Sequence, residues 1–452
     1  MKVRHLACAI FLFFLLPKSF AFIGIHESDT VSVSSKVGES PFIPKPRGTD
    51  KETLEFGNWA IRETNPDTSW VRVGGAFRLN AIWTHYEGKT APLGTFIQNE
   101  WTWDTWWLEI DAYKDGLQFA FQYRFFPTFN THFIKFGWVG YRFNENNNLQ
   151  FGITQVPFGL LTYASHNWWF QLPYYIGLED DHQMGFNYTK KWKDWTLNAA
   201  YFLMSEPRGT NELSFGEAST ARYSYDVVPI EGNNNIERHQ WNIRAARQVG
   251  NAELGLSLQT HQVFNQVTSQ IGRNYAAAVH YEQDYGRWNL KTQALYYSYV
   301  DVRDDAGNTL DVVQMGAYGF GTYDVASKAA MYLAGLAYDI PVSWGPIRNI
   351  QLYNNYTYMQ KFNEVVLGNE RVRFANTQQN VFGALVTAGH IYAYFDIARG
   401  VNHPWLTGEF GGNALGTGRG IQDVSQPVSI DNPINNRPGW NTRLNINMGY
   451  YF

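Results

Sequence analysis

The feature that most constrains this sequence is a period-two alternation of apolar and polar residues, which recurs in short segments from Trp70 onward. In the last such segment, Thr442–Phe452, one side of an extended chain carries five apolar residues: Leu444, Ile446, Met448, Tyr450 and Phe452. The other side is mainly polar. Segments of about ten residues with this pattern are typical of transmembrane β-barrels, where one face meets lipid and the other water. A strand of a β-sandwich also alternates, so other features have to decide between the two folds.

Many other segments alternate in the same way, five of them clearly. The clear ones are Trp70–Trp83, Leu117–Phe126, Leu149–Gln155, Arg238–Gln248 and Glu253–His261. The fainter ones are Trp103–Tyr113, His132–Phe143, His182–Thr189, Trp195–Met204, Asn274–Glu282, Trp288–Val300, Val312–Tyr323, Ala329–Ile340, Ile350–Gln360, Asn380–Thr387 and Ile391–Arg399. The total is about 17, and single-chain bacterial barrels use even numbers of strands. We therefore predict an all-β fold, a transmembrane antiparallel β-barrel of about 16 strands over residues 70–452, with the weak candidate Val312–Tyr323 as loop.

The links between these segments fall into two classes by length. The short links are Tyr113–Gly116, Asn144–Asn148, Lys190–Asp194, Val249–Ala252, Asp284–Arg287, Pro341–Pro346 and Ala388–His390. The long links are Pro157–Asp181, Ser205–Ile236, Asp301–Asp311, Lys361–Thr377 and Gly400–Asn441. The two classes largely alternate, as short periplasmic turns and long extracellular loops do in barrels. A sandwich has no reason to sort its loops in this way, so the loop lengths favour the barrel.

The N-terminal region differs from the rest of the chain. Lys2 and Arg4 precede an apolar run and then Ser19-Phe20-Ala21, which predicts a signal peptide over residues 1–21. Residues 22–69 show no sustained alternation, and we expect an irregular N-terminal extension there. These features predict export to the bacterial cell outer membrane. The formal net charge of −4, which loses further basic residues with the signal peptide, argues against nucleic acid as a partner.

Basic residues recur on the polar faces of the predicted strands. An arginine on the lipid face costs about 2–4 kcal/mol at the membrane midplane, so we expect these side chains in the lumen. The predicted pore-lining and anion-binding residues are Arg72, Arg78, Arg124, Lys135, Arg238, Arg244 and Arg443, with Lys291 as a further candidate. Guanidinium groups match the geometry of phosphate and carboxylate. An alternative remains open: the basic residues pair with luminal acids such as Glu109, Asp111 and Glu282 and only stiffen the wall.

The long link 157–181 is too apolar for a wholly exposed loop. We predict that it folds into the lumen and constricts the pore. The residues expected at the constriction are His166, Asn167, Trp168, Trp169 and Gln171. The aromatic run could also guide sugars or other flat solutes. The open alternatives are an external loop with an aromatic girdle, or a contact between subunits.

The segment Leu149–Thr189 resembles the phosphate-selective porin O and P family. The similar motifs are QFGITQVPFGL, SHNWW and GLEDDHQMGFNYTKK. The signal peptide, the chain length and the final strand ending in Phe452 are also similar, and such an ending resembles that of bacterial outer-membrane proteins. The resemblance implies a 16-stranded barrel that assembles as a homotrimer, with a ladder of luminal arginines for phosphate or polyphosphate. The similar motifs do not include the residues of that ladder.

Patterns typical of enzymes are missing from the sequence. It contains neither G-x-S-x-G nor H-E-x-x-H, and its 11 histidines lack ligand spacing. We therefore predict no catalytic residue, no cofactor and no metal. The predicted function is passive diffusion of small hydrophilic solutes through an outer-membrane porin in contact with membrane lipid, with an anion or phosphate preference as the finer expectation. The alternatives are a channel for neutral sugars or aromatic solutes, and a non-channel barrel with a structural or adhesive role.

Overall fold

The computed structural model describes residues 69–85, 100–161, 163–211, 220–319, 321–367, 369–406, 412–418 and 439–452. The predicted signal peptide, and all of the predicted N-terminal extension except residue 69, lie outside these ranges. The described helices are the short 3-10 turns η3 (Pro127–Phe129) and η4 (Leu172–Ile176). Within the described ranges, no helix has the length and apolar character needed to cross a membrane.

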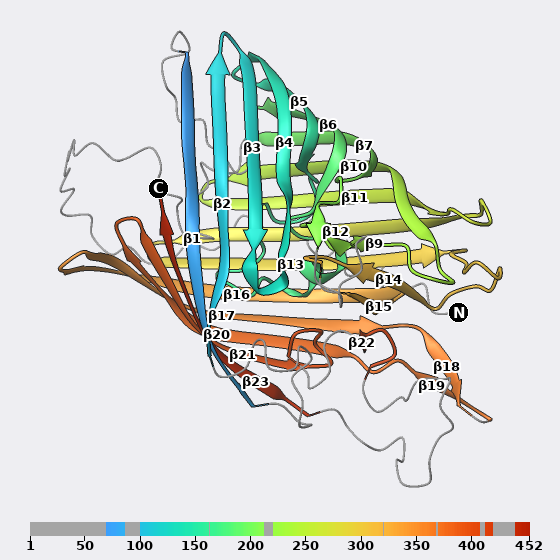
Figure 1. Cartoon of the computed structure of the whole chain (residues 1–452). Coiled ribbons are helices and arrows are strands. Elements are labelled where there is room, and N and C mark those ends of the chain that lie inside the picture. The colour runs from blue at the N-terminus through green and yellow to red at the C-terminus, as the bar shows by residue number, and fades with distance from the viewer. Residues whose placement is uncertain are drawn as a thin grey trace, which may run out of the picture. The chain divides into compact units, whose positions relative to one another are not determined.

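Sixteen strands form a closed wall in which each strand pairs antiparallel with the next wall strand along the chain (Figure 1). The wall strands are β1 (Trp70–His85), β2 (Glu100–Lys114), β3 (Leu117–Phe126), β4 (Thr131–Asn144), β5 (Asn147–Gln155), β6 (His182–Trp192), β7 (Trp195–Ser205), β10 (Asn235–Val249), β11 (Ala252–Asn265), β12 (Ile271–Tyr285), β13 (Trp288–Val300), β16 (Lys328–Trp344), β17 (Ile347–Lys361), β20 (Thr377–Ala388), β21 (Ile391–Val401) and β23 (Asn441–Tyr451). The ring closes where β1 pairs with β23, from Ala76 opposite Tyr451 to His85 opposite Thr442. The predicted 16-stranded antiparallel barrel is therefore confirmed.

The alternation in the sequence corresponds to the two faces of this wall. In β23, Leu444 and Tyr450 are 45% and 50% exposed on the outer face, whereas Arg443 and Asn447 are 5% and 1% exposed on the inner face. Exposed aromatic and aliphatic side chains continue around the outside of the other wall strands. Because the ladder hydrogen bonds use the strands' backbone groups, this apolar surface can face hydrocarbon at no cost in unsatisfied polar groups.

Short turns connect the wall strands at one end. The links at the other end are mostly long, with 127–130 and 266–270 as the short exceptions. The turn between β2 and β3 is made of Asp115 and Gly116, whose φ angles are 50° and 86°. A two-residue turn of type I′ needs positive φ at both central residues, which Asp and Gly tolerate well. The sorting of loops by length therefore agrees with the prediction made from the sequence.

A smaller sheet of four short strands is separate from the wall. Its members are β9 (Asp226–Val227), β14 (Val312–Gly316), β15 (Thr322–Ala326) and β22 (Gly412–Leu415), which come from three of the long loops. The weak candidate Val312–Tyr323 is thus outside the wall, as predicted, but it forms the hairpin β14–β15 rather than irregular loop. Two minor pairings join β8 (Thr210–Asn211) to β4, and β18 (Glu364–Leu367) to β19 (Glu370–Arg373).

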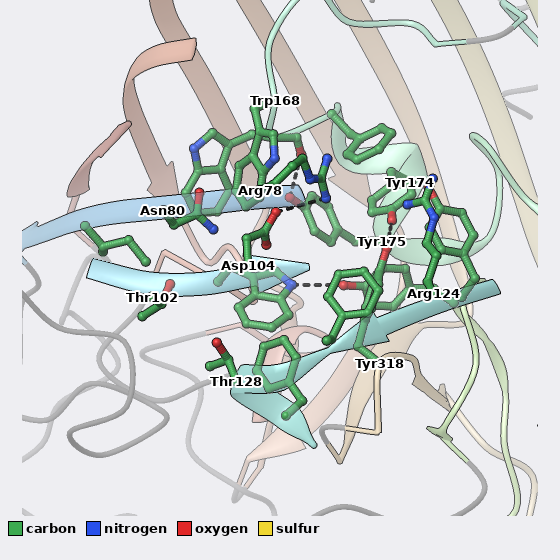
Figure 2. Close-up of a pocket in the computed structure, with 18 of the residues that line it drawn as sticks. Arg78, Asn80, Thr102, Asp104, Arg124, Thr128, Trp168, Tyr174, Tyr175 and Tyr318 are labelled. Carbon is green, nitrogen blue, oxygen red and sulfur yellow. Dashed lines mark hydrogen bonds and ion pairs between the residues drawn. The ribbon is translucent and has the colours of Figure 1, made fainter. Parts of the chain in front are cut away.

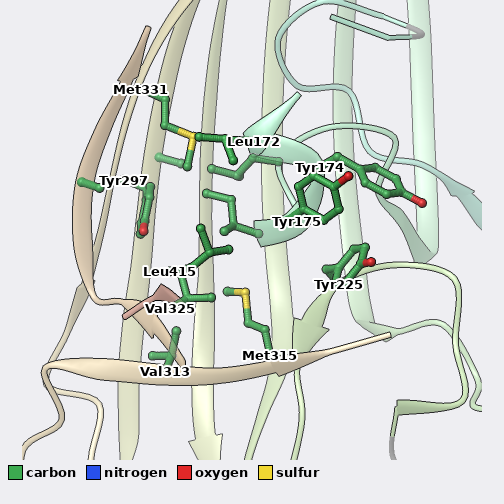
Figure 3. Packing of buried hydrophobic residues seen from close by; sticks show 14 of the residues in the cluster. Leu172, Tyr174, Tyr175, Tyr225, Tyr297, Val313, Met315, Val325, Met331 and Leu415 are labelled. Atoms are coloured by element: carbon green, nitrogen blue, oxygen red, sulfur yellow. The ribbon is translucent and has the colours of Figure 1, made fainter. Parts of the chain in front are cut away.

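A hydrophobic cluster attaches the small sheet and η4 to the inner face of the wall (Figure 3). It includes Leu172 and Tyr174 of η4, Met315 of β14, and Tyr297 and Met331 of the wall strands β13 and β16. Large-barrel interiors are usually polar, so an apolar core on this inner face is unusual. Each fully buried apolar side chain contributes roughly 1.5–3 kcal/mol. The cluster therefore fixes the segments that fold into the lumen.

Candidate functional site

The segment between β5 and β6, residues 156–181, crosses the interior of the barrel. Near its start, the backbone N–H groups of Gly159 and Leu160 donate to Ser257 of β11 (3.0 Å) and Gln293 of β13 (2.8 Å). Further along, Gln379 of β20 donates to the carbonyl oxygen of Phe170 at 3.0 Å. Strands β11, β13 and β20 lie far around the ring from β5 and β6. In the structure, residues 157–181 therefore run through the lumen.

Three of the predicted constriction residues attach this segment to the wall. The backbone N–H of His166 donates to Asn355 Oδ1 at 3.1 Å, and Asn167 Nδ2 donates to the same oxygen at 2.9 Å. His166 Nε2 lies 2.6 Å from Asn289 Oδ1, and Gln171 accepts a hydrogen bond from Thr357. Burial lowers the pKa of His166 to about 3, so its ring is neutral at pH 7. These side chains act as anchors and add no charge to the lumen.

The end of the segment is held by an ion pair with the wall strand β4. Lys135 Nζ lies 2.9 Å from Asp180 Oδ2, and both side chains are almost completely buried. The Tyr223 hydroxyl donates to the same carboxylate oxygen at 2.5 Å. The charge of Lys135, together with the hydrogen bond from Tyr223, keeps the pKa of Asp180 below its usual value against the opposing effect of burial. Lys135 therefore lies on the inner face, with its charge balanced by Asp180.

Other predicted basic residues also bind side chains of the barrel wall or the backbone of the crossing segment. Arg72 forms an ion pair of 3.0 Å with Asp111. Arg244 pairs with Glu253 at 2.5 Å and donates to the carbonyl oxygen of Gly159 at 2.8 Å. Lys291 donates to the carbonyl oxygen of Tyr163 at 2.8 Å. For these residues the structure places the basic group against an acid or against the crossing segment.

Arg238 differs from the prediction because of a bulge in β10. The regular pairing with β11 is interrupted between Arg238 and Trp241, and His239 has a φ of 53°. As a result, the neighbouring Glu237 takes the buried inner position, and Arg238 lies beside Gln262, on the same side of the strands as exposed Leu258. Its Nε donates to Gln262 Oε1 at 3.2 Å. The sequence does not reveal this bulge, which reverses the face that Arg238 occupies.

Arg78, Arg124 and Arg443 come together around one cavity of about 110 Å³ (Figure 2). Arg78 forms an ion pair with Asp104 at 2.9 Å. The guanidinium of Arg124 lies over the rings of Trp107 and Tyr223, at 4.4 and 4.9 Å from their centroids. These contacts fix the direction of the cationic groups. The three arginines belong to β1, β3 and β23, so the charged side of the cavity is built on rigid, adjacent parts of the wall.

The rest of the cavity lining is mainly aromatic and comes mostly from the loops. Trp168 and Trp169 are the two predicted constriction residues that reach it, and Arg443 lies 4.5 Å from the centroid of the Trp169 ring. Sequence reasoning did not single out the remaining aromatic residues: Phe126, Phe129, Phe170, Tyr174, Tyr175, Tyr223, Tyr225, Tyr318 and Trp405. Tyr223 and Tyr225 lie in a long loop that, like residues 157–181, contains apolar rings close together. The same criterion, applied to every long loop, would have identified Tyr223 and Tyr225.

Comparisons with known proteins identify the fold. No protein-family model matches the sequence, and no curated protein matches it. Among solved structures, outer-membrane expressed OmpT of Vibrio cholerae aligns with a TM-score of 0.50 and 11% identity, over 85% of this chain and 98% of its own. OmpF of Salmonella typhi, solved in complex with daunomycin, aligns with a TM-score of 0.50 and 10% identity, over 86% and 99%. At these identities the likeness shows a shared barrel fold.

The location of the protein follows from its wall. The closed barrel has an apolar outer face, and its strands pair around the whole ring. Such a barrel is stable where hydrocarbon surrounds it and water reaches its two ends. The chain is a protein of the bacterial outer membrane.

Proposed function

We propose that this protein is an outer-membrane porin in which small hydrophilic solutes diffuse passively, with a preference for anions. The observation that carries the proposal is the meeting of Arg78, Arg124 and Arg443 at one cavity inside the barrel. Among the described residues that line it, three guanidinium groups face one carboxylate, that of Asp104. A net positive lining in a narrow passage favours anions.

Only part of the predicted basic wall supports this preference. Arg72, Lys135 and Arg244 each lie against a carboxylate, so their field in the lumen is largely cancelled. Guanidinium groups bind phosphate and carboxylate alike. The phosphate preference implied by the sequence resemblance therefore stays an expectation about the solute, as does the homotrimer about the assembly.

The test is the reversal potential of single channels in a planar bilayer with a KCl gradient. We expect anion selectivity in the unchanged protein and a clear loss of it in Arg124→Gln. Arg238→Gln is the matched control, since it removes the same charge from outside the cavity and should keep the selectivity. Cation preference in the unchanged protein would reject the anion preference. A correctly folded protein that gives no conductance would reject the porin and favour a non-channel barrel.

A further inference from the structure

The cavity has two chemically different sides (Figure 2). Arg78, Arg124 and Arg443 come from wall strands, whereas Trp168, Tyr175 and Trp405 come from segments that fold inward. The charged side offers planar groups with several N–H donors, which match the two oxygens of a carboxylate. The other side offers aromatic rings. A solute that uses both sides needs an anionic group at one end and an apolar, flat body at the other.

The tyrosine hydroxyls around the cavity are already engaged within the protein. The hydroxyls of Tyr174 and Tyr318 hydrogen-bond to each other, and that of Tyr175 donates to the carbonyl oxygen of Trp169 at 2.6 Å. Trp405 Nε1 donates to the hydroxyl of Tyr225 at 3.0 Å. These residues therefore present ring surface to the cavity more than polar groups. The neutral polar side chains in the lining are Asn80, Thr102 and Thr128, and Asn80 and Thr128 already hydrogen-bond to Asn447 and to the carbonyl oxygen of Trp103. A neutral sugar, which needs hydrogen-bond partners on all sides, therefore finds few of them here.

Several rings remain accessible to a solute. Trp168, Phe129 and Trp405 are only partly buried, although they line the cavity. The rings of Trp168 and Trp169 lie 5.6 Å apart at 88°, so one of them can offer its face where the other offers its edge. Both geometries are favourable for a further aromatic ring.

The size of the cavity limits the solute to about one ring. Its volume of about 110 Å³ is somewhat smaller than the apolar cavity of about 150 Å³ known to bind benzene. A phosphate ion would fit, but it would use the arginines and leave the aromatic side without a partner. A monocyclic aromatic carboxylate matches the charge and the aromatic surface together, and it is the smallest kind of aromatic carboxylate.

We propose that this cavity binds monocyclic aromatic carboxylates, with the carboxylate at Arg78, Arg124 and Arg443 and the ring against Trp168 and its aromatic neighbours. The proposal rests on the proposed function, because it names the class of anion that the porin prefers. In this proposal the two sides of the cavity recognise different parts of the solute. The arginines select the charge, and the rings select the flat body.

The test compares block of the single-channel KCl current by four probes: benzoate, acetate, benzyl alcohol and inorganic phosphate. We expect benzoate to reach half-block at a concentration at least about tenfold below that of each other probe, because only benzoate contacts both sides. Equal block by benzoate and acetate would overturn the proposal. Stronger block by phosphate than by benzoate would also overturn it and would favour the phosphate expectation.

Variants separate the two sides of the cavity. Trp168→Ala should raise the half-blocking concentration of benzoate about tenfold and change that of acetate much less. Trp241→Ala is the matched control, because Trp241 is 58% exposed on the outer face. Arg124→Gln should weaken block by benzoate and acetate alike. If Trp168→Ala affects both carboxylates equally, the ring side has no role in recognition and the proposal is wrong.

A second measurement keeps this proposal distinct from the porin itself. Benzoate binding to the folded protein in detergent can be followed by tryptophan fluorescence, with acetate as the reference probe. Benzoate binding without any conductance would keep the site and reject the porin. An anion-selective channel that binds benzoate no better than acetate would keep the porin and reject the aromatic carboxylate site.

Discussion

The two sides of the lumen use similar side chains for different purposes. On the side of β10 to β17, Arg244, Lys291 and Asn355 bind the crossing segment or its neighbours directly. On the side of β23 to β3, Arg78, Arg124 and Arg443 line the cavity. A luminal basic residue is therefore not by itself a sign of solute binding. What decides its role is whether a folded segment already occupies the space in front of it.

The largest expected effect comes from releasing the crossing segment. In Lys135→Ala, Asp180 loses its buried ionic partner, and breaking a buried pair costs about 3–5 kcal/mol. We expect a lower thermal unfolding temperature and a larger, noisier single-channel conductance, because residues 157–181 lose their hold on β4. The double variant with Asp180→Asn removes both charges and should recover part of the stability. An unchanged conductance in Lys135→Ala would mean that the segment does not limit the passage.

A pH change should loosen the same segment from within. Glu179 is buried, and burial raises the pKa of its carboxyl from 4.5 to about 8. With a raised pKa, the carboxyl stabilises the folded state fully at pH values below its pKa in the unfolded chain, which is about 4.5. This stabilisation is lost as the pH rises through the pKa of the folded state, about 8. Thermal stability should therefore fall between pH 5 and pH 9 by an amount on the order of a few kcal/mol. Burial also raises the pKa of Asp181 and Glu206, which adds to the same trend.

The variant Glu179→Gln identifies the contribution of this carboxyl. Its melting temperature should depend less on pH over this range than that of the unchanged protein. Asp304→Asn is a suitable control, since Asp304 lies in a loop outside this segment and hydrogen bonds from Asn308 keep the pKa of its carboxyl below the usual value. A pH profile of Glu179→Gln that matches the original would assign the effect to Asp181 and Glu206 instead.

The smallest expected difference is the one between Arg443→Gln and Lys291→Gln. Both remove one luminal charge, but only Arg443 lines the cavity. We expect Arg443→Gln to lower the ratio of anion to cation permeability roughly threefold. Lys291→Gln should lower stability by about 1 kcal/mol through its lost hydrogen bond to Tyr163, and should keep the permeability ratio. Equal effects of the two variants on selectivity would contradict the division between the two sides.

The wall could be predicted from the sequence because lipid imposes a local rule. Each strand shows its two faces within its own residues, and short turns such as Asp115–Gly116 mark its ends. The candidate Val312–Tyr323 could be excluded from the wall, because the number of strands in such a barrel is even. The position of Arg238 could not be predicted, because one extra residue at a bulge reverses a face without any change in composition.

The cavity could be predicted only in part. Arg78, Arg124, Arg443, Trp168 and Trp169 were all identified from the sequence, but as members of two separate sets. Their meeting depends on the path of residues 157–181 across the ring, and the aromatic residues from other loops join them there. Periodicity carries no information about such contacts between distant segments. Only the three-dimensional structure shows which residues anchor the crossing segment and which line the cavity.

The closure of the ring has a consequence for biogenesis. Arg78 is in the first wall strand and Arg443 in the last, and these two strands meet at the seam. Their meeting joins residues more than 350 positions apart in the chain, and contacts between residues so distant in sequence are slow to form. An incompletely assembled barrel therefore has no complete cavity, and solute binding reports that assembly is finished.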